Sequence, residues 1–223
     1  MQYAQIIGAY VADYYLFALE IIGTVAFSIS GAILGMRRGM DLLGVMLMGI
    51  VTAVGGGILR DILIGNTPPI AFRAPVYLIV ALAAAGIFFF IMCFRRQKGK
   101  LHYDGLWQLM DAIGLAGFTV TGIGTCITLN GDYQESLFLL LFVGVVTGVG
   151  DGVIRDILAQ VPPSILHEGF YASASLAGAL CCALLWPIAG KEAAMLCGVI
   201  LILVLRFIAV RCHWRLPRFT KEV

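Results

Sequence analysis

Two short segments place an arginine and an aspartate behind a run of glycines in otherwise apolar sequence. The first is VGGGILRDIL at 54–63, and the second is its near copy VGDGVIRDIL at 149–158. A charged side chain inside an apolar stretch is costly in a membrane, so it is usually paired or lines a water-filled path. The arginine and aspartate of each segment are therefore candidates for buried ion pairs or for an ion path.

Two carboxylates, Glu20 and Asp111, precede these segments at matching places. At a rise of about 1.5 Å per residue, Glu20 and Arg60 both lie roughly 10 Å to the outer side of a membrane centre, and Asp111 and Arg155 roughly 10 Å to the inner side. We expect Glu20 to pair with Arg60 and Asp111 to pair with Arg155. The aspartate that follows each arginine is a competing partner, and the spacing does not choose between them.

The composition indicates that these charges lie in a membrane. Of the 223 residues, 61% are hydrophobic and 13% charged, and the mean hydropathy is +0.96, whereas about 25% of the residues of a soluble domain are charged. A transmembrane helix needs about 20 apolar residues. Seven such windows occur, at 14–36, 42–64, 74–94, 106–128, 136–158, 169–189 and 193–211. No window alternates apolar and polar residues, which disfavours a β-barrel, and we predict an all-α integral membrane protein with seven transmembrane helices.

Matching segments divide the first six windows into two repeats. LEIIGTVAFSISG at 19–31 aligns with MDAIGLAGFTVTG at 110–122, and the two glycine segments align with each other. The aligned pairs are Glu20 with Asp111, Gly23 with Gly114, Phe27 with Phe118, Gly31 with Gly122, Thr52 with Thr147, Gly55 with Gly150, Gly57 with Gly152, Arg60 with Arg155 and Asp61 with Asp156. Because each repeat holds three helices, an odd number, the second repeat must cross the membrane in the opposite sense. The fold is predicted to be a 3+3 inverted repeat plus a seventh helix.

The expected organisation follows from these repeats and from the basic residues. The first repeat spans 14–94, a basic cytoplasmic linker 95–104, the second repeat 105–189, the seventh helix 193–211, and a basic cytoplasmic tail 212–223. An external N-terminus places ten Lys and Arg residues inside and only two outside, which predicts a cytoplasmic C-terminus. The linker is also a candidate contact for anionic lipid headgroups, although it serves equally as an orientation signal.

The glycine clusters lie a little past the middle of their helices, where a glycine costs about 1 kcal/mol relative to alanine. Such a cost indicates either a kink or close helix packing. Asp151 stands where the first repeat has Gly56, and its i, i+4 relation to Arg155 allows a local pair. This asymmetry marks either a gate or ion-binding point, or sequence drift.

A polar stripe of Glu20, Thr24 and Ser28 at i, i+4 and i+8 is typical of a wet path. The windows 74–94 and 169–189 carry no charge, so we expect the windows 14–36, 42–64, 106–128 and 136–158 to line the path and the other three to form an outer wall. Carboxylates outnumber arginines in the spans five to three, which favours cations. The alternative is that the charges only clamp helices together. The candidate residues are Glu20, Ser28, Gly55, Gly56, Gly57, Arg60, Asp61, Asp111, Thr119, Gly150, Asp151, Gly152, Arg155 and Asp156.

The paired GGGILRD and GDGVIRD segments, together with the seventh helix and the external N-terminus, resemble the prokaryotic TRIC-type (trimeric intracellular cation) channels, which are related to bacterial membrane proteins regarded as glycine transporters. The resemblance covers residues 14–211. It implies a homotrimer in a bacterial inner membrane, the cell membrane, with one pore per protomer that is kinked at the two glycine segments and conducts potassium or sodium. Animal members carry a voltage-linked lysine in the fourth helix, and the window 106–128 has no lysine.

Other classes of function are weighed against this channel. A secondary transporter for a small zwitterion such as glycine uses the same inverted repeat and midplane charges. An enzyme is disfavoured because no catalytic cluster occurs within the spans. No metal site or other cofactor is indicated by the spacing of the three His and six Cys residues. The net charge of +2 is too small to imply a nucleic-acid partner.

Overall fold

The computed structural model describes residues 14–96, 104–130, 136–167, 170–212 and 214. In these ranges seven helices are long and apolar enough to span a membrane, which confirms the prediction, and each begins and ends within three residues of its window. They are α2 (Tyr14–Arg37), α3 (Leu42–Leu63), α5 (Val76–Arg96), α6 (Asp104–Asn130), α7 (Leu137–Leu158), α9 (Ala172–Ala189) and α10 (Lys191–Arg211). Most of the predicted linker and nearly all of the predicted tail lie outside the described residues.

Two short helices, α4 (Ile70–Arg73) and α8 (Ser164–His167), follow the Pro-Pro pairs and were not expected from the sequence. The aspartate of each Arg-Asp pair organises the turn that leads into them. Asp61 Oδ2 accepts the amide of the first residue of α4 at 2.6 Å, and Asp156 Oδ2 accepts the amide of the first residue of α8 at 2.7 Å. A carboxylate at a helix N-terminus satisfies amides that have no partner within the helix.

The second helix of each repeat also begins in the same way. Asp41 caps α3 by accepting the amide of Gly44 at 2.8 Å, and Ser136 caps α7 by accepting the amide of Leu139 at 3.2 Å. Asp and Ser are favoured at this position because their side chains satisfy an exposed amide of the first turn. The equivalent caps fix where each glycine-bearing helix starts, and so the level of its Arg-Asp pair.

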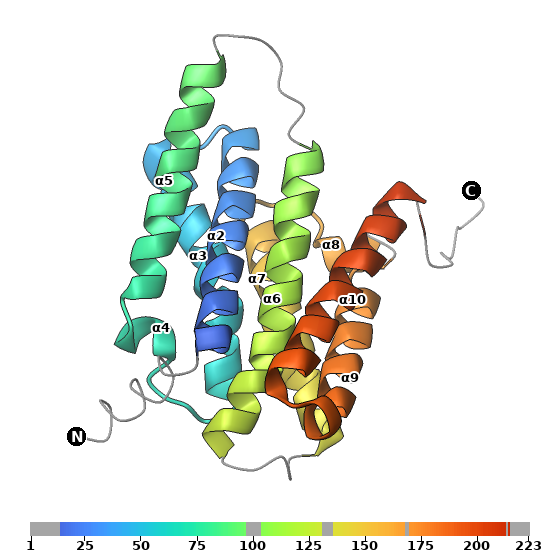
Figure 1. Cartoon of the computed structure of the whole chain (residues 1–223). Helices are drawn as coiled ribbons and strands as arrows, with labels where there is room; N and C mark the ends of the chain where they lie inside the picture. The colour runs from blue at the N-terminus through green and yellow to red at the C-terminus, as the bar shows by residue number, and fades with distance from the viewer. Residues whose placement is uncertain (1–13, 97–103, 131–135, 168–169, 213, 215–223) are drawn as a thin grey trace, which may run out of the picture.

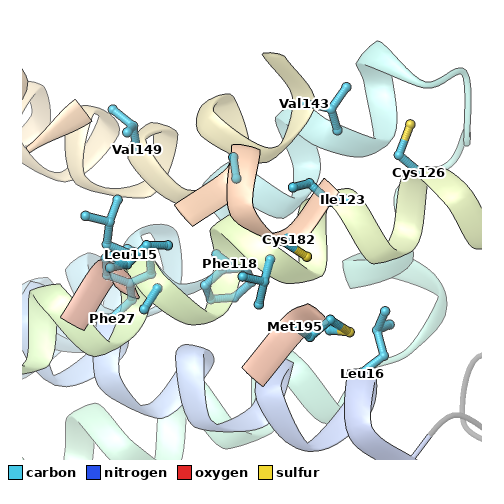
Figure 2. Close-up of a cluster of buried hydrophobic side chains, with 14 of the residues drawn as sticks. Leu16, Phe27, Leu115, Phe118, Ile123, Cys126, Val143, Val149, Cys182 and Met195 are labelled. Atoms are coloured by element: carbon cyan, nitrogen blue, oxygen red, sulfur yellow. The ribbon is translucent and has the colours of Figure 1, made fainter. Parts of the chain in front are cut away.

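The two repeats run in opposite directions. In Figure 1, α2 begins at the lower end of the molecule and runs upward, whereas α6 begins at the upper end and runs downward beside it. The contact between them is itself symmetric: the rings of Phe27 and Phe118, which are aligned residues, stack at a centroid distance of 5.6 Å. Each ring covers the glycine of the other repeat, Phe27 over Gly114 and Phe118 over Gly23. Figure 2 shows both rings beside Leu115 in the buried cluster that joins the repeats.

The helices form an inner and an outer group. Of the most apolar part of α6, 83% is buried, compared with 33% for α5, α9 and α10. α3 and α7 pack against each other, while α5 covers α2 and α3, and α9 and α10 cover α6 and one another. The four helices that carry most of the charges, α2, α3, α6 and α7, therefore meet at the centre of the molecule.

Candidate functional site: two buried charge clusters

The first cluster joins three helices around Arg60. Arg60 Nη1 donates to Glu20 Oε1 at 2.8 Å, and Arg60 Nε donates to Asp61 Oδ1 at 2.9 Å. Tyr77 of α5 donates its hydroxyl to Glu20 Oε2 at 2.6 Å. Glu20, Arg60 and Asp61 are at most 3% exposed. The predicted pair of Glu20 with Arg60 is confirmed.

The second cluster repeats this pattern around Arg155. Arg155 Nη1 donates to Asp111 Oδ1 and to Ser30 Oγ, the latter at 2.7 Å, and Arg155 Nε donates to Asp156 Oδ1 at 2.8 Å. All these side chains are buried. The predicted pair of Asp111 with Arg155 is confirmed, and in both clusters the competing aspartate binds as well. A guanidinium has five donors in a planar fork, so it does not have to choose between two carboxylates.

The third and seventh transmembrane helices, which we expected in an outer wall, each add a side chain to one of the clusters. Tyr77 of α5 completes the first cluster. Arg206 of α10 reaches the second, where its Nη2 lies 3.9 Å from Asp111 Oδ2 and its guanidinium carbon lies 4.6 Å from the ring centroid of Tyr171. One signal could have found the two tyrosines: each follows the first proline of a Pro-Pro pair by nine residues. Arg206 is a charge inside an apolar span, but no repeat partner pointed to its position.

Three of the predicted glycines lie where α3 of the first repeat packs against α7 of the second. A Cβ atom at Gly56 would overlap the carbonyl oxygen of Thr147. A Cβ at Gly55 would lie 2.8 Å from Ile154, and its counterpart Gly150 faces Leu59 at 3.1 Å in the same way. Both helices are continuous through their glycines. Gly55, Gly56 and Gly150 therefore provide close helix packing, one of the two readings open from the sequence, and the kink stays a prediction.

The remaining predicted glycines face other groups. Gly57 has no atom within 4 Å of a Cβ position and lines a cavity in the first cluster, while a Cβ at Gly152 would lie 2.8 Å from the Tyr171 hydroxyl. Of the five predicted glycines, only Gly57 therefore borders open space among the described residues.

Asp151 crosses between the repeats. Its Oδ1 accepts the amide of Gly56, the residue with which it is aligned, at 2.5 Å. The local pair with Arg155 that the spacing allowed is absent among the described contacts, because Asp151 is directed toward α3 while Arg155 binds other carboxylates. Oδ2 of Asp151 has no hydrogen-bond partner within the described part of the chain. Asp151 is fully buried, so its carboxyl group lies inside the crossing of α3 and α7.

The hydroxyls of the polar stripe do not share one surface. Ser28 donates to the carbonyl of Ala81 on α5 at 2.6 Å, and its counterpart Thr119 bonds Ser175 on α9 at 2.8 Å. These two hydroxyls hold the third helix of each repeat in place. Thr24 is buried, its Oγ1 has no partner among the described residues, and it lines the cavity of the first cluster.

That cavity has a volume of about 30 Å³, more than the roughly 10–15 Å³ that one water molecule needs. Its polar lining is Glu20, Thr24, Arg60, Asp61 and Tyr77, and its other described lining residues are Ala53, Val54, Gly57, Ile70, Ala71 and Phe118. A cavity of this size with polar groups in its wall can hold a water molecule.

Comparison with known proteins groups the chain with bacterial membrane proteins. A family model described as "Glycine transporter" matches residues 17–92 and 108–187, one match for each repeat. The chain is 37% identical to the "UPF0126 membrane protein" of Deinococcus radiodurans over 89% of both chains. It is 36% identical to the "UPF0126 inner membrane protein YadS" of Escherichia coli K12, over 92% of this chain and 96% of the relative.

Solved structures extend this grouping to the TRIC channels. One, from work on the "Structural basis for conductance through TRIC cation channels", is 35% identical, has a TM-score of 0.79, and matches 92% of this chain and 98% of its own. The "TRIC trimeric intracellular cation channel orthologue from Rhodobacter sphaeroides" is 28% identical with a TM-score of 0.80, over 89% and 98%. These solved relatives are ion channels rather than enzymes. The chain therefore belongs to the TRIC-type family of membrane proteins, together with its UPF0126 relatives.

Proposed function

We propose that the protein is a channel for monovalent cations, potassium or sodium, with one ion path in each protomer of a homotrimer. The observation that carries the proposal is the match to a solved TRIC cation channel at 35% identity over 92% of the chain. The charges support it: the buried carboxylates Glu20, Asp61, Asp111, Asp151 and Asp156 outnumber the buried arginines Arg60, Arg155 and Arg206. An acidic excess in a low-dielectric path attracts cations and repels anions.

The path runs from the first cluster to the second between α2, α3, α6 and α7. Asp151 and Gly56 join α3 to α7 midway along it. Gly55 and Gly56 allow the close contact of α3 with α7, and a separation of the two helices at this contact opens the path. In the bacterial inner membrane the first cluster lies toward the outside and the C-terminus toward the cytoplasm.

The channel is tested by recording the purified protein in planar bilayers under a potassium gradient, with labelled glycine uptake measured in proteoliposomes of the same preparation. We expect unitary steps that reverse near the potassium potential, and no accumulation of glycine. Asp151→Asn should lower the unitary conductance, while the exposed acid-to-amide control Glu192→Gln should leave it unchanged. Silent bilayers with saturable, gradient-driven glycine uptake would replace the channel by a carrier.

A further inference from the structure

Trp107 lies beside the second charge cluster. It belongs to the first turn of α6 and precedes Asp111 by four residues, so the two side chains lie on the same face of the helix. In Figure 1, α6 begins at the upper end of the molecule, where α2 ends. Trp107 is therefore one helical turn closer to this end than Asp111. In the orientation proposed above, this end faces the cytoplasm.

The indole ring of Trp107 contacts one buried and one exposed guanidinium group. The guanidinium carbon of Arg155 lies 5.0 Å from the ring centroid, and that of Arg37, the last residue of α2, lies 5.8 Å from it. Arg155 is fully buried, whereas Arg37 is exposed. A cation over the face of a tryptophan ring is attracted by the ring. The indole therefore lies at the boundary between the buried cluster and the surface.

The other neighbours of Trp107 are apolar. The ring packs against a buried cluster that includes Ile33, Phe88 and Met92. Its indole nitrogen is buried and has no hydrogen-bond partner among the described residues. A buried donor without a partner is costly, and this cost disappears when the side chain turns its N–H to water. The ring is thus held over Arg155 by its face and by packing, without a hydrogen bond that fixes it there.

The first repeat has no aromatic ring at the corresponding position. The register that aligns Glu20 with Asp111 also aligns Leu16 with Trp107. Leu16 is 1% exposed and packs in the main apolar cluster. It is not among the described residues that line the cavity around Arg60. The aromatic cover is therefore a feature of only one end of the proposed path.

We propose that Trp107 closes the inner end of the ion path. In the closed state the indole covers Arg155, and with its apolar neighbours it excludes water between the second cluster and the cytoplasm. An apolar constriction without water stops ions. The path opens at this end when the ring leaves Arg155 and its N–H reaches water. This gate rests on the proposed channel function and names a residue that controls it.

The test is single-channel recording of Trp107→Leu and Trp107→Phe in planar bilayers under a potassium gradient. Leucine, the residue of the first repeat, offers no aromatic face to Arg155, whereas phenylalanine keeps one. We expect Trp107→Leu to raise the ratio of open to closed time at least about twofold, through shorter closed times, because the closed state loses its cation–π contact. The unitary conductance should stay unchanged. Trp107→Phe should change the closed times less than Trp107→Leu does.

The matched control is Trp186→Leu, because Trp186 of α9 is also a half-buried indole but packs against the main apolar cluster. This variant should leave the closed times unchanged. If Trp107→Leu does not fold, Trp107→Met, which also lacks an aromatic face, takes its place. Fewer active channels with unchanged closed times would show that Trp107 has only a structural role and would overturn the gate.

Gate and channel can fail separately. Current in the unmodified protein, with closed times that Trp107→Leu does not shorten or that Trp107→Phe shortens equally, overturns the gate and keeps the channel. Current that appears only in Trp107→Leu supports both. Silence of the unmodified protein and of every variant overturns the channel, and the gate with it.

Discussion

At the scale of single residues, the charges of this protein work in shared networks rather than in isolated pairs. Arg155 binds Asp111, Asp156 and Ser30, and all of them are buried. Removing one member of a buried ionic network leaves the others uncompensated, which costs more than the network contributes when complete. The arginines are therefore structurally required, whether or not an ion passes them.

The first prediction concerns this network. Arg155→Met should lower the free energy of unfolding by about 3–5 kcal/mol, because Asp111 and Asp156 lose their main partner in a low-dielectric site. Adding Asp111→Asn should recover part of the loss, since Arg206 remains near position 111 and one buried charge is gone. Thermal unfolding in detergent measures both.

The control for this cycle is Arg38→Met, because Arg38 is exposed and its side chain donates to the carbonyl of Gln160 at the surface. It should change stability by less than about 1 kcal/mol. Additive losses in the Arg155→Met, Asp111→Asn double variant would mean that the two side chains are not energetically coupled.

At the scale of elements, α3 and α7 pack through residues without side chains. Gly56 lies against the carbonyl oxygen of Thr147, and its amide binds Asp151. In helices a closely packed glycine permits an approach that any Cβ prevents. This explains why the interior of α3 carries Gly55 and Gly56 despite the cost of about 1 kcal/mol for each glycine.

The second prediction compares neighbouring glycines of α3. Gly56→Ala should lower the free energy of unfolding by about 1–3 kcal/mol, because its Cβ meets backbone that cannot rotate away. Gly57→Ala should be neutral or stabilising by up to about 1 kcal/mol, because no atom lies within 4 Å of its Cβ. Thermal unfolding midpoints of the two variants, measured under the same conditions, test this difference. Equal destabilisation would show that the glycines act through helix propensity and not through the contact with α7.

At the scale of the whole molecule, the two repeats share their architecture but not their charges. Both use the same arginine contacts, the same aspartate at the start of a short helix, and the same threonine-to-carbonyl bond in the glycine helix. α10, which belongs to neither repeat, breaks the symmetry by placing Arg206 beside Asp111 only. The two ends of the proposed path therefore differ in their buried charges.

The third prediction concerns assembly. Since the solved relatives include a protein described as a trimeric cation channel, we expect the purified protein in mild detergent to have the protein mass of three 24.0 kDa chains. Light scattering coupled to size exclusion measures this mass after subtraction of the detergent. Chemical crosslinking in native membranes should stop at a three-chain band, and a uniform single-chain species in both experiments would contradict the homotrimer.

Several features followed from the sequence alone, for identifiable reasons. The number of transmembrane helices follows from the length of the apolar windows, and the opposite direction of the repeats follows from an odd number of helices in each. The pairs Glu20 with Arg60 and Asp111 with Arg155 followed from depth, because a membrane requires partners for buried charges and helix rise sets the level of each residue.

The tertiary structure decided which groups meet around each helix axis. The depth of a residue in the membrane does not determine which way its side chain faces around the helix axis. The sequence therefore predicted neither that Tyr77 joins the first cluster nor that Arg206 joins the second. Asp151 was given a local partner by its spacing, yet its carboxylate binds the amide of Gly56 on another helix. These contacts depend on how closely the glycines let α3 and α7 approach and on how each helix is turned, and both are properties of the packed bundle rather than of any one segment.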